Sequence, residues 1–62
     1  MKVYIATVTD ESDFGRVIFD ECLASCDQAW GAIELFIAGW KVKHPEFGYA
    51  AEGKVKEYTV RG

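Results

Sequence analysis

The chain has 62 residues, half of them hydrophobic, and a formal net charge of −3. This length predicts a single domain over residues 1–62, which buries only about 60% of the surface of its unfolded chain. The composition excludes a disordered tail, and the negative charge argues against a general nucleic-acid binder. Two cysteines and one histidine leave little scope for disulfide or metal stabilisation, so self-association is favoured.

Acidic side chains are concentrated in the first half of the chain. Residues 1–34 hold seven acidic and two basic side chains, whereas residues 35–62 hold three and five. An acidic half suits a basic partner surface, because opposite charges speed and orient association. Lys2 is followed by alternating residues rather than by an apolar stretch, so no signal peptide is predicted. We expect a cytoplasmic protein without a membrane span, in which both cysteines are thiols.

Two strands joined by a turn are predicted at the start of the chain. Residues 2–9 are rich in β-branched side chains and lack Gly and Pro, as expected of a strand. Both alternating sides of this segment are largely apolar, which indicates a central strand covered on two sides. Residues 10–15 are turn-forming and end in Gly15, and residues 16–22 are typical of a second strand. Together these segments predict a β-hairpin.

A long helix is predicted for residues 26–43. Ser25, followed three residues later by a glutamine, is a capping-box pattern at its start. Pro45 disfavours further helix, although Gly39 allows an earlier end. We favour the longer helix because its apolar stripe continues to Trp40. The stripe expected to face the core consists of Trp30, Ile33, Ile37 and Trp40.

The opposite face of this helix is also largely apolar. Small apolar residues are common on protein surfaces, so this face has an ordinary explanation. The alternative is a second contact, in which small residues let another subunit approach closely. On that alternative, the predicted oligomer interface consists of Gly31, Leu35, Ala38 and Val42.

The end of the chain completes a predicted β-β-α-β order. Residues 45–53 form a loop, in which Phe47 and Tyr49 either fold back on the core or serve as partner anchors. Residues 54–60 alternate as a third strand. The predicted fold class is a two-layer α+β domain, with a three-stranded antiparallel-type sheet of order 2-1-3 and the helix on one face. We expect the other sheet face, or the apolar helix face, to form a homodimer contact.

No catalytic, cofactor or metal site is predicted. Residues 10–21 partly match a calcium loop, but Phe14 occupies a ligand position and strands flank the segment. Cys22 and Cys26 are too few for a metal site and are expected to be small buried hydrophobic residues. His44 is the only histidine, and its position suits the end of a helix better than a catalytic pair. We therefore expect no enzymatic activity.

The succession of Val3–Thr9, Arg16–Cys22 and Ser25–Ile33 resembles small proteins encoded by phages and mobile elements. The best-understood examples are anti-CRISPR and other anti-defence inhibitors, which are compact, often acidic and frequently dimeric. The resemblance implies a non-enzymatic inhibitor that binds a larger protein.

The leading functional hypothesis is a non-catalytic homo-oligomer that binds a larger protein through an acidic hairpin. Its predicted contact residues are Asp10, Glu11, Asp13, Phe14, Asp20 and Glu21. The alternative is an oligomer that sequesters a small molecule or nucleotide, whose anionic group would face Lys54, Lys56 and Arg61. A third hypothesis is an RNA-binding accessory domain that uses the same basic strand. The negative net charge disfavours it, so nucleic acid is not the expected partner.

Overall fold

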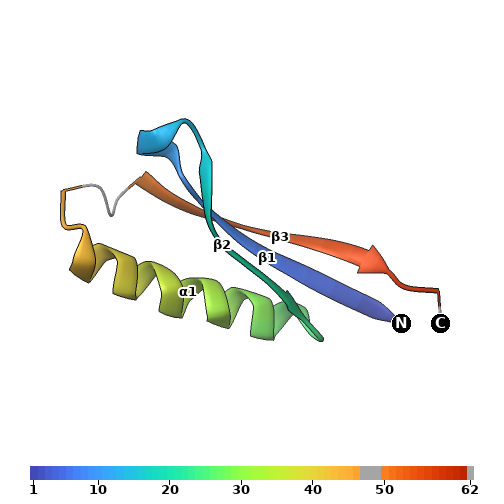
Figure 1. Cartoon of the computed structure of the whole chain (residues 1–62). Helices are drawn as coiled ribbons and strands as arrows, with labels where there is room; N and C mark the ends of the chain where they lie inside the picture. The colour runs from blue at the N-terminus through green and yellow to red at the C-terminus, as the bar shows by residue number, and fades with distance from the viewer. Residues whose placement is uncertain (47–49, 62) are drawn as a thin grey trace.

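The computed structural model describes residues 1–46 and 50–61, which form three strands, a short 3₁₀ turn and one helix. The strands lie in the order β2-β1-β3, and β1 is antiparallel to both neighbours. The helix covers one face of this sheet (Figure 1). The predicted α+β fold class and strand order are therefore confirmed. In chain order the elements are β1 (Lys2–Asp10), η1 (Glu11–Asp13), β2 (Arg16–Leu23), α1 (Cys26–Lys43) and β3 (Ala51–Thr59).

Strand β3 begins three residues earlier than the sequence indicates. Ala51 and Gly53 belong to it and pair with Asp10 and Val8 of β1. Gly53 lies beneath the helix, where a Cβ atom would overlap Cγ2 of Ile33. The glycine that looked like the end of a loop is thus a position at which helix and sheet approach one another closely.

Helix α1 has the predicted bounds, and the longer of its two expected ends is correct. Ser25 Oγ accepts a hydrogen bond from the amide of Gln28 at 3.2 Å. At the other end, the amide of His44 donates to the Trp40 carbonyl at 2.8 Å. The predicted core stripe is wrong at Trp30, which is 44% exposed. The stripe is centred instead on Ala29 and Ile33, with Phe36, Ile37 and Trp40 half-buried beside them.

The hydrophobic core is small and lies between β1 and α1. Its fully buried members are Ala6, Val8, Ala29 and Ile33. Ala6 and Val8 share one side of β1, whereas Val3 and Ile5 on the other side are only half-buried. Both sides of this strand are apolar as predicted, but within the described chain only one of them is covered.

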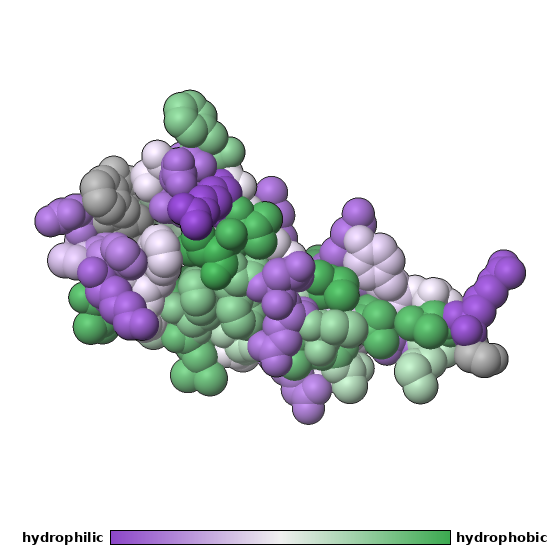
Figure 2. All heavy atoms as spheres, viewed as in Figure 1, coloured by the Kyte–Doolittle hydropathy of each residue, from purple (hydrophilic) through white to green (hydrophobic). Residues whose placement is uncertain are grey.

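The molecule exposes more surface than a compact domain of its size. Its accessible surface is 4536 Å², against about 4,000 Å² expected for a monomer of 6.9 kDa. Its radius of gyration is 12.5 Å, against roughly 10.6 Å for a compact chain of this length. The ends of β1 and β3 that carry the termini project past the start of α1 (Figure 1). Figure 2 shows hydrophobic side chains at the surface along the length of the molecule, with charged ones between them.

Candidate partner-binding end of the molecule

The tip of the β1–β2 hairpin is a closed and well-hydrogen-bonded turn. The Asp10 carboxylate accepts hydrogen bonds from both the amide and the hydroxyl of Ser12, and the amide bond measures 3.0 Å. The amide of Gly15 donates to the Asp10 carbonyl at 3.1 Å. These contacts cap the 3₁₀ turn η1 through Asp10, the residue that precedes it. The turn therefore has a fixed backbone, although it lies at the end of the molecule.

Phe14 is the most exposed large side chain at this tip. Its relative exposure is 103%, so the ring contacts almost nothing in its own chain. Its backbone is left-handed, with φ 56° and ψ 32°. This conformation costs a non-glycine residue on the order of 1–3 kcal/mol, which the other contacts of the turn must offset. The turn thus holds an aromatic ring in solvent at a local energetic cost.

Two acidic side chains belong to the turn that precedes this ring. Glu11 accepts a hydrogen bond from the Thr9 hydroxyl at 3.1 Å. Asp13 lies 3.6 Å from the Arg16 guanidinium in an ion pair whose two members are both more than half exposed. Water screens such a pair strongly, so the surroundings of Phe14 remain acidic.

The structure divides the six predicted contact residues into separate groups. Glu11, Asp13 and Phe14 lie together at the hairpin tip. Asp10 belongs to the same turn, but it is only 9% exposed and its carboxylate is occupied within the turn. Asp20 and Glu21 lie further along β2 and pair with Thr7 and Ala6 of β1, on opposite faces of the sheet. Sequence proximity grouped these acids, whereas strand alternation separates them.

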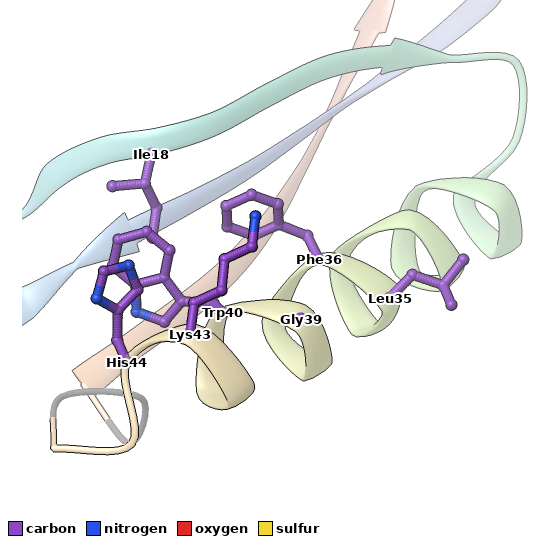
Figure 3. A pocket seen from close by; sticks show the side chains of 7 residues that line it. All are labelled: Ile18, Leu35, Phe36, Gly39, Trp40, Lys43 and His44. Atoms are coloured by element: carbon purple, nitrogen blue, oxygen red, sulfur yellow. The ribbon is translucent and has the colours of Figure 1, made fainter.

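A groove that sequence analysis missed lies between β2 and the second half of α1 (Figure 3). Its volume is about 450 Å³. Ile18 lines its sheet side because the β1–β2 register shifts at this point. Both Ile18 and Phe19 then pack on the helix side, as expected at a bulge. The residues lining the groove are Ile18, Leu35, Phe36, Gly39, Trp40, Lys43 and His44.

A row of stacked rings forms the wall of this groove. Phe19 stacks on Phe36 with ring centroids 4.8 Å apart, and Phe36 lies 6.0 Å from Trp40. The His44 ring follows at 4.1 Å from Trp40. The buried Nε1 of Trp40 has no hydrogen-bond partner among the described residues. The four-residue spacing of Phe36, Trp40 and His44 was the available sequence signal, because it places their rings on one helix face.

The second half of α1, which lines the groove, lies at the same end of the molecule as the hairpin tip, remote from both termini (Figure 1). Strand β2 is an edge strand and runs from the tip along the groove. An edge strand beside an apolar groove is the arrangement in which many domains receive an extended segment of a partner. This end therefore combines an exposed aromatic side chain, acidic groups and an apolar groove.

Most of the residues predicted for oligomerisation and anion binding lie elsewhere, although Leu35 also lines the groove. Leu35 and Val42 on α1 are 78% and 82% exposed, and Ala38 is also exposed. Gly31 belongs to the same helix, and a Cβ atom at this position would meet nothing within 4 Å. On β3, Lys54 and Lys56 occupy the uncovered sheet face, and Arg61 lies exposed beyond the strand. The Lys56 ammonium lies 5.5 Å from the centre of the Tyr58 ring.

The expectation that both cysteines are buried is wrong. Cys22 and Cys26 are free thiols and both are exposed. Cys22 faces outward from the uncovered side of an edge strand, and Cys26 is the first residue of α1, so neither is covered. Within residues 1–46 and 50–61, no group of three or more His, Cys, Asp or Glu side chains could hold a metal ion. Phe47 and Tyr49 lie outside the described residues.

One tyrosine has a perturbed pKa. The Tyr4 hydroxyl donates a hydrogen bond to Glu57 at 3.1 Å, and this bond raises the pKa of Tyr4 above its ordinary value of 10.0. Lys2 lies 3.6 Å from the same carboxylate and partly opposes the shift. The cluster is a cross-strand contact that stabilises the neutral phenol.

A functional proposal for this chain rests on its fold and on these surfaces, because the comparisons with known proteins found no match. No family model, curated protein or solved structure matches the chain. In the described part of the chain, no helix has the length and apolar character needed to cross a bilayer.

Proposed function

We propose that this protein is a non-catalytic interaction module that binds a larger protein through its hairpin end, with Phe14 as the anchor. The observation that carries the proposal is a fully exposed aromatic ring on a left-handed backbone. Glycine would adopt this backbone without strain, so the folding of the isolated chain does not account for phenylalanine there. An aromatic side chain that enters a pocket of a partner does account for it, because such residues dominate interface energies.

The surroundings of Phe14 support a partner of particular chemistry. Glu11 and Asp13 belong to the turn that ends at Phe14, so the complementary surface is a hydrophobic pocket with basic side chains at its rim. The groove beside β2 supports a second contact with the same partner, in which an extended segment pairs with the edge strand. An inhibitor of the anti-defence type, as the resemblance implies, would be one instance of such a module.

The substitution Phe14→Gly separates binding from folding. It relieves the left-handed strain, so we expect the thermal midpoint to stay the same or to rise. Loss of the anchor should weaken partner binding by about 30-fold or more, as for an interface hot spot. The matched control is Val42→Ser, which removes another exposed hydrophobic side chain that lies outside the groove and should leave partner binding unchanged.

The partner is found by capture with tagged wild-type protein from cells that encode it, followed by calorimetry with the purified candidate. Proteins recovered by wild type and Val42→Ser but lost with Phe14→Gly support the proposal. Equal affinity of the wild type and Phe14→Gly for the purified partner would contradict it. The double reversal Glu11→Lys with Asp13→Lys should mainly slow association and remove its salt dependence. Asp10 is left unchanged in that variant because its carboxylate holds the turn.

Sequestration of an anionic ligand remains the second candidate. Lys54, Lys56 and Tyr58 share the uncovered face of β3, and Lys56 lies over the Tyr58 ring. This arrangement suits a phosphate beside an aromatic base, in a nucleotide or in RNA. Asp20 and Glu52 lie on the same face, which weakens the case. A thermal-shift screen with nucleotides, repeated on a Lys54→Glu and Lys56→Glu double variant, tests this candidate.

A further inference from the structure

The uncovered face of the sheet has an ordered arrangement of charge. Its centre is the outer side of β1, where Val3, Ile5, Thr7 and Thr9 are half-buried. On the β2 edge, Asp20 lies beside Thr7, and on the β3 edge Lys54 lies beside the same Thr7. One row across the sheet therefore runs from an acidic through a neutral to a basic side chain.

We infer that this face binds a second copy of the chain, through a two-fold axis that lies between the sheets and parallel to β1. Such an axis carries the β2 edge of one copy over the β3 edge of the other and keeps every residue at its height along the strands. Since Asp20 and Lys54 share one height, Asp20 of each copy then faces Lys54 of the other. The dimer contains this ion pair twice, as an isologous interface requires.

The distance between packed sheets fits these ion pairs. Two sheets pack about 10 Å apart with their strands within about 30° of one another. An extended Lys and an Asp side chain together span that separation. The other face-to-face arrangement, with its axis across the strands, places β2 over β2 and β3 over β3. In that arrangement Asp20 of one copy cannot reach Lys54 of the other, because the two residues lie on opposite edges of the sheet. The β3 edge also carries Glu52, so the Asp20–Lys54 pairs, rather than a uniform charge of either edge, favour the first arrangement.

A hollow in the same face gives the dimer a shape match. The depression is shallow, has a volume of about 500 Å³ and lies around Ile5. Tyr58 stands on β3 beside Val3. The proposed axis places Lys56 of one copy opposite Cys22 of the other, and Tyr58 two residues further along, beside the end of β2 at Leu23. The residues lining the depression are Val3, Ile5, Asp20, Glu21, Cys22 and Tyr58.

The available area suits a dimer of moderate affinity. Three strands about 4.8 Å apart and eight residues long give a face of roughly 14 by 27 Å, so pairing two copies buries on the order of 1,000 Å². This is near the lower limit of specific interfaces and indicates micromolar dissociation. Pairing would also cover surface that this chain exposes beyond the expectation for its size.

The inference is tested by sedimentation velocity on the isolated protein, without any partner, from 1 to about 500 µM. The wild type should dimerise. Ile5→Glu places two carboxylates face to face near the axis, and should weaken the dimer by more than about 100-fold while the circular dichroism spectrum is retained. Because no partner is present, the result is independent of the function proposed for Phe14.

Charge exchange tests the direction of the axis. Asp20→Lys and Lys54→Asp should each weaken the dimer roughly tenfold, because each places like charges opposite one another twice. Combining the two restores the pairs with reversed polarity, so the double variant should return to within about threefold of wild type. Glu34→Lys and Lys41→Asp change the net charge equally on exposed helix positions and should leave the dimer unchanged.

Several results would overturn the inference. The proposed interface is wrong if the wild type is monomeric over the whole concentration range, or if the dimer survives Ile5→Glu. If the double charge exchange fails to restore association, the proposed direction of the two-fold axis is wrong. Dissociation by Leu35→Ser and Val42→Ser instead would assign the contact to α1. A monomer whose Lys54 and Lys56 resonances shift on addition of short RNA would assign the face to nucleic acid.

Discussion

The two sides of β1 have similar side chains and different roles. Ala6 and Val8 face α1 and are completely buried, whereas Val3 and Ile5 face away from the helix and remain half-exposed. A central strand whose two sides are both apolar is normally packed against other elements on each side. Here one helix supplies cover for one side only. The comparison indicates that the first side stabilises the monomer and the second is available for association.

The two sides should differ most in the free energy of unfolding that is lost when an isoleucine is truncated to alanine. Ile33 is 2% exposed and packs on the covered side, so Ile33→Ala should cost about 2–5 kcal/mol, enough to unfold much of a small domain. Ile5→Ala on the uncovered side should cost about 1 kcal/mol or less in the monomer. Urea unfolding at low protein concentration measures both. Equal costs would show that the uncovered side also stabilises the monomer.

The close approach at Gly53 provides the next test of the covered side. Gly53→Ala should cost about 1–3 kcal/mol, because its Cβ would overlap the stiff, branched side chain of Ile33. Ile33→Leu removes Cγ2 at nearly constant volume, so the double variant should lose less stability than the sum of the singles. Gly39→Ala has open space and should stabilise the helix by about 1 kcal/mol. Additive costs in the double variant would contradict the contact.

Variants of Asp10 test whether its carboxylate, at the end of the covered side of β1, stabilises the fold. Asp10→Ala removes two hydrogen bonds and the cap of the turn, so we expect a loss of about 1–2 kcal/mol in chemical denaturation. Asp10→Asn keeps an acceptor oxygen and should lose less. Glu11→Ala is the matched control and should stay within about 0.5 kcal/mol of wild type. If Asp10→Ala is as stable as the control, its carboxylate is free for a partner after all.

The smallest expected effect is the pH dependence at Tyr4. The hydrogen bond to Glu57 raises the pKa of Tyr4 above 10.0, so folding favours the neutral phenol. Its contribution to stability is complete below pH 10 and is lost as the pH rises through the raised pKa. The stability difference between wild type and Tyr4→Phe should therefore shrink at high pH. Absorbance titration should show Glu57→Gln lowering the phenol pKa. An unchanged pKa would exclude this hydrogen bond as its cause.

Most of the architecture was predictable because local patterns specify it. The capping residue Ser25 and the stripe to Trp40 predicted the full helix, and alternation in residues 2–9 predicted a central strand. The exceptions involve contacts distant in sequence. Gly53 was assigned to a loop because its need for space arises only when Ile33 lies above it. Trp30 was placed in the core because helical periodicity defines the apolar face of a helix but not which residues of that face are most buried.

The candidate site was predictable in composition but not in arrangement. The acidic hairpin and Phe14 were identified from the sequence, yet Asp10 proved to be occupied within the turn, and Asp20 and Glu21 diverge on β2. The groove between β2 and α1 was missed, because a bulge at Ile18 helps to form its sheet side. Sequence neighbours were grouped as one surface, whereas pairing between strands decides which side chains share a face.

The sequence by itself determined the element types, since turn residues, caps and hydrophobic periods act within about one element. The two apolar sides of residues 2–9 and the connection rules then indicated the strand order. Tertiary structure alone decided which side of β1 is covered by the helix and which charged side chains lie in one row across the sheet. Those features follow from the register between strands and from how closely α1 approaches the sheet at Gly53. Both are set by packing between segments that lie far apart in the chain, a property that no local pattern encodes.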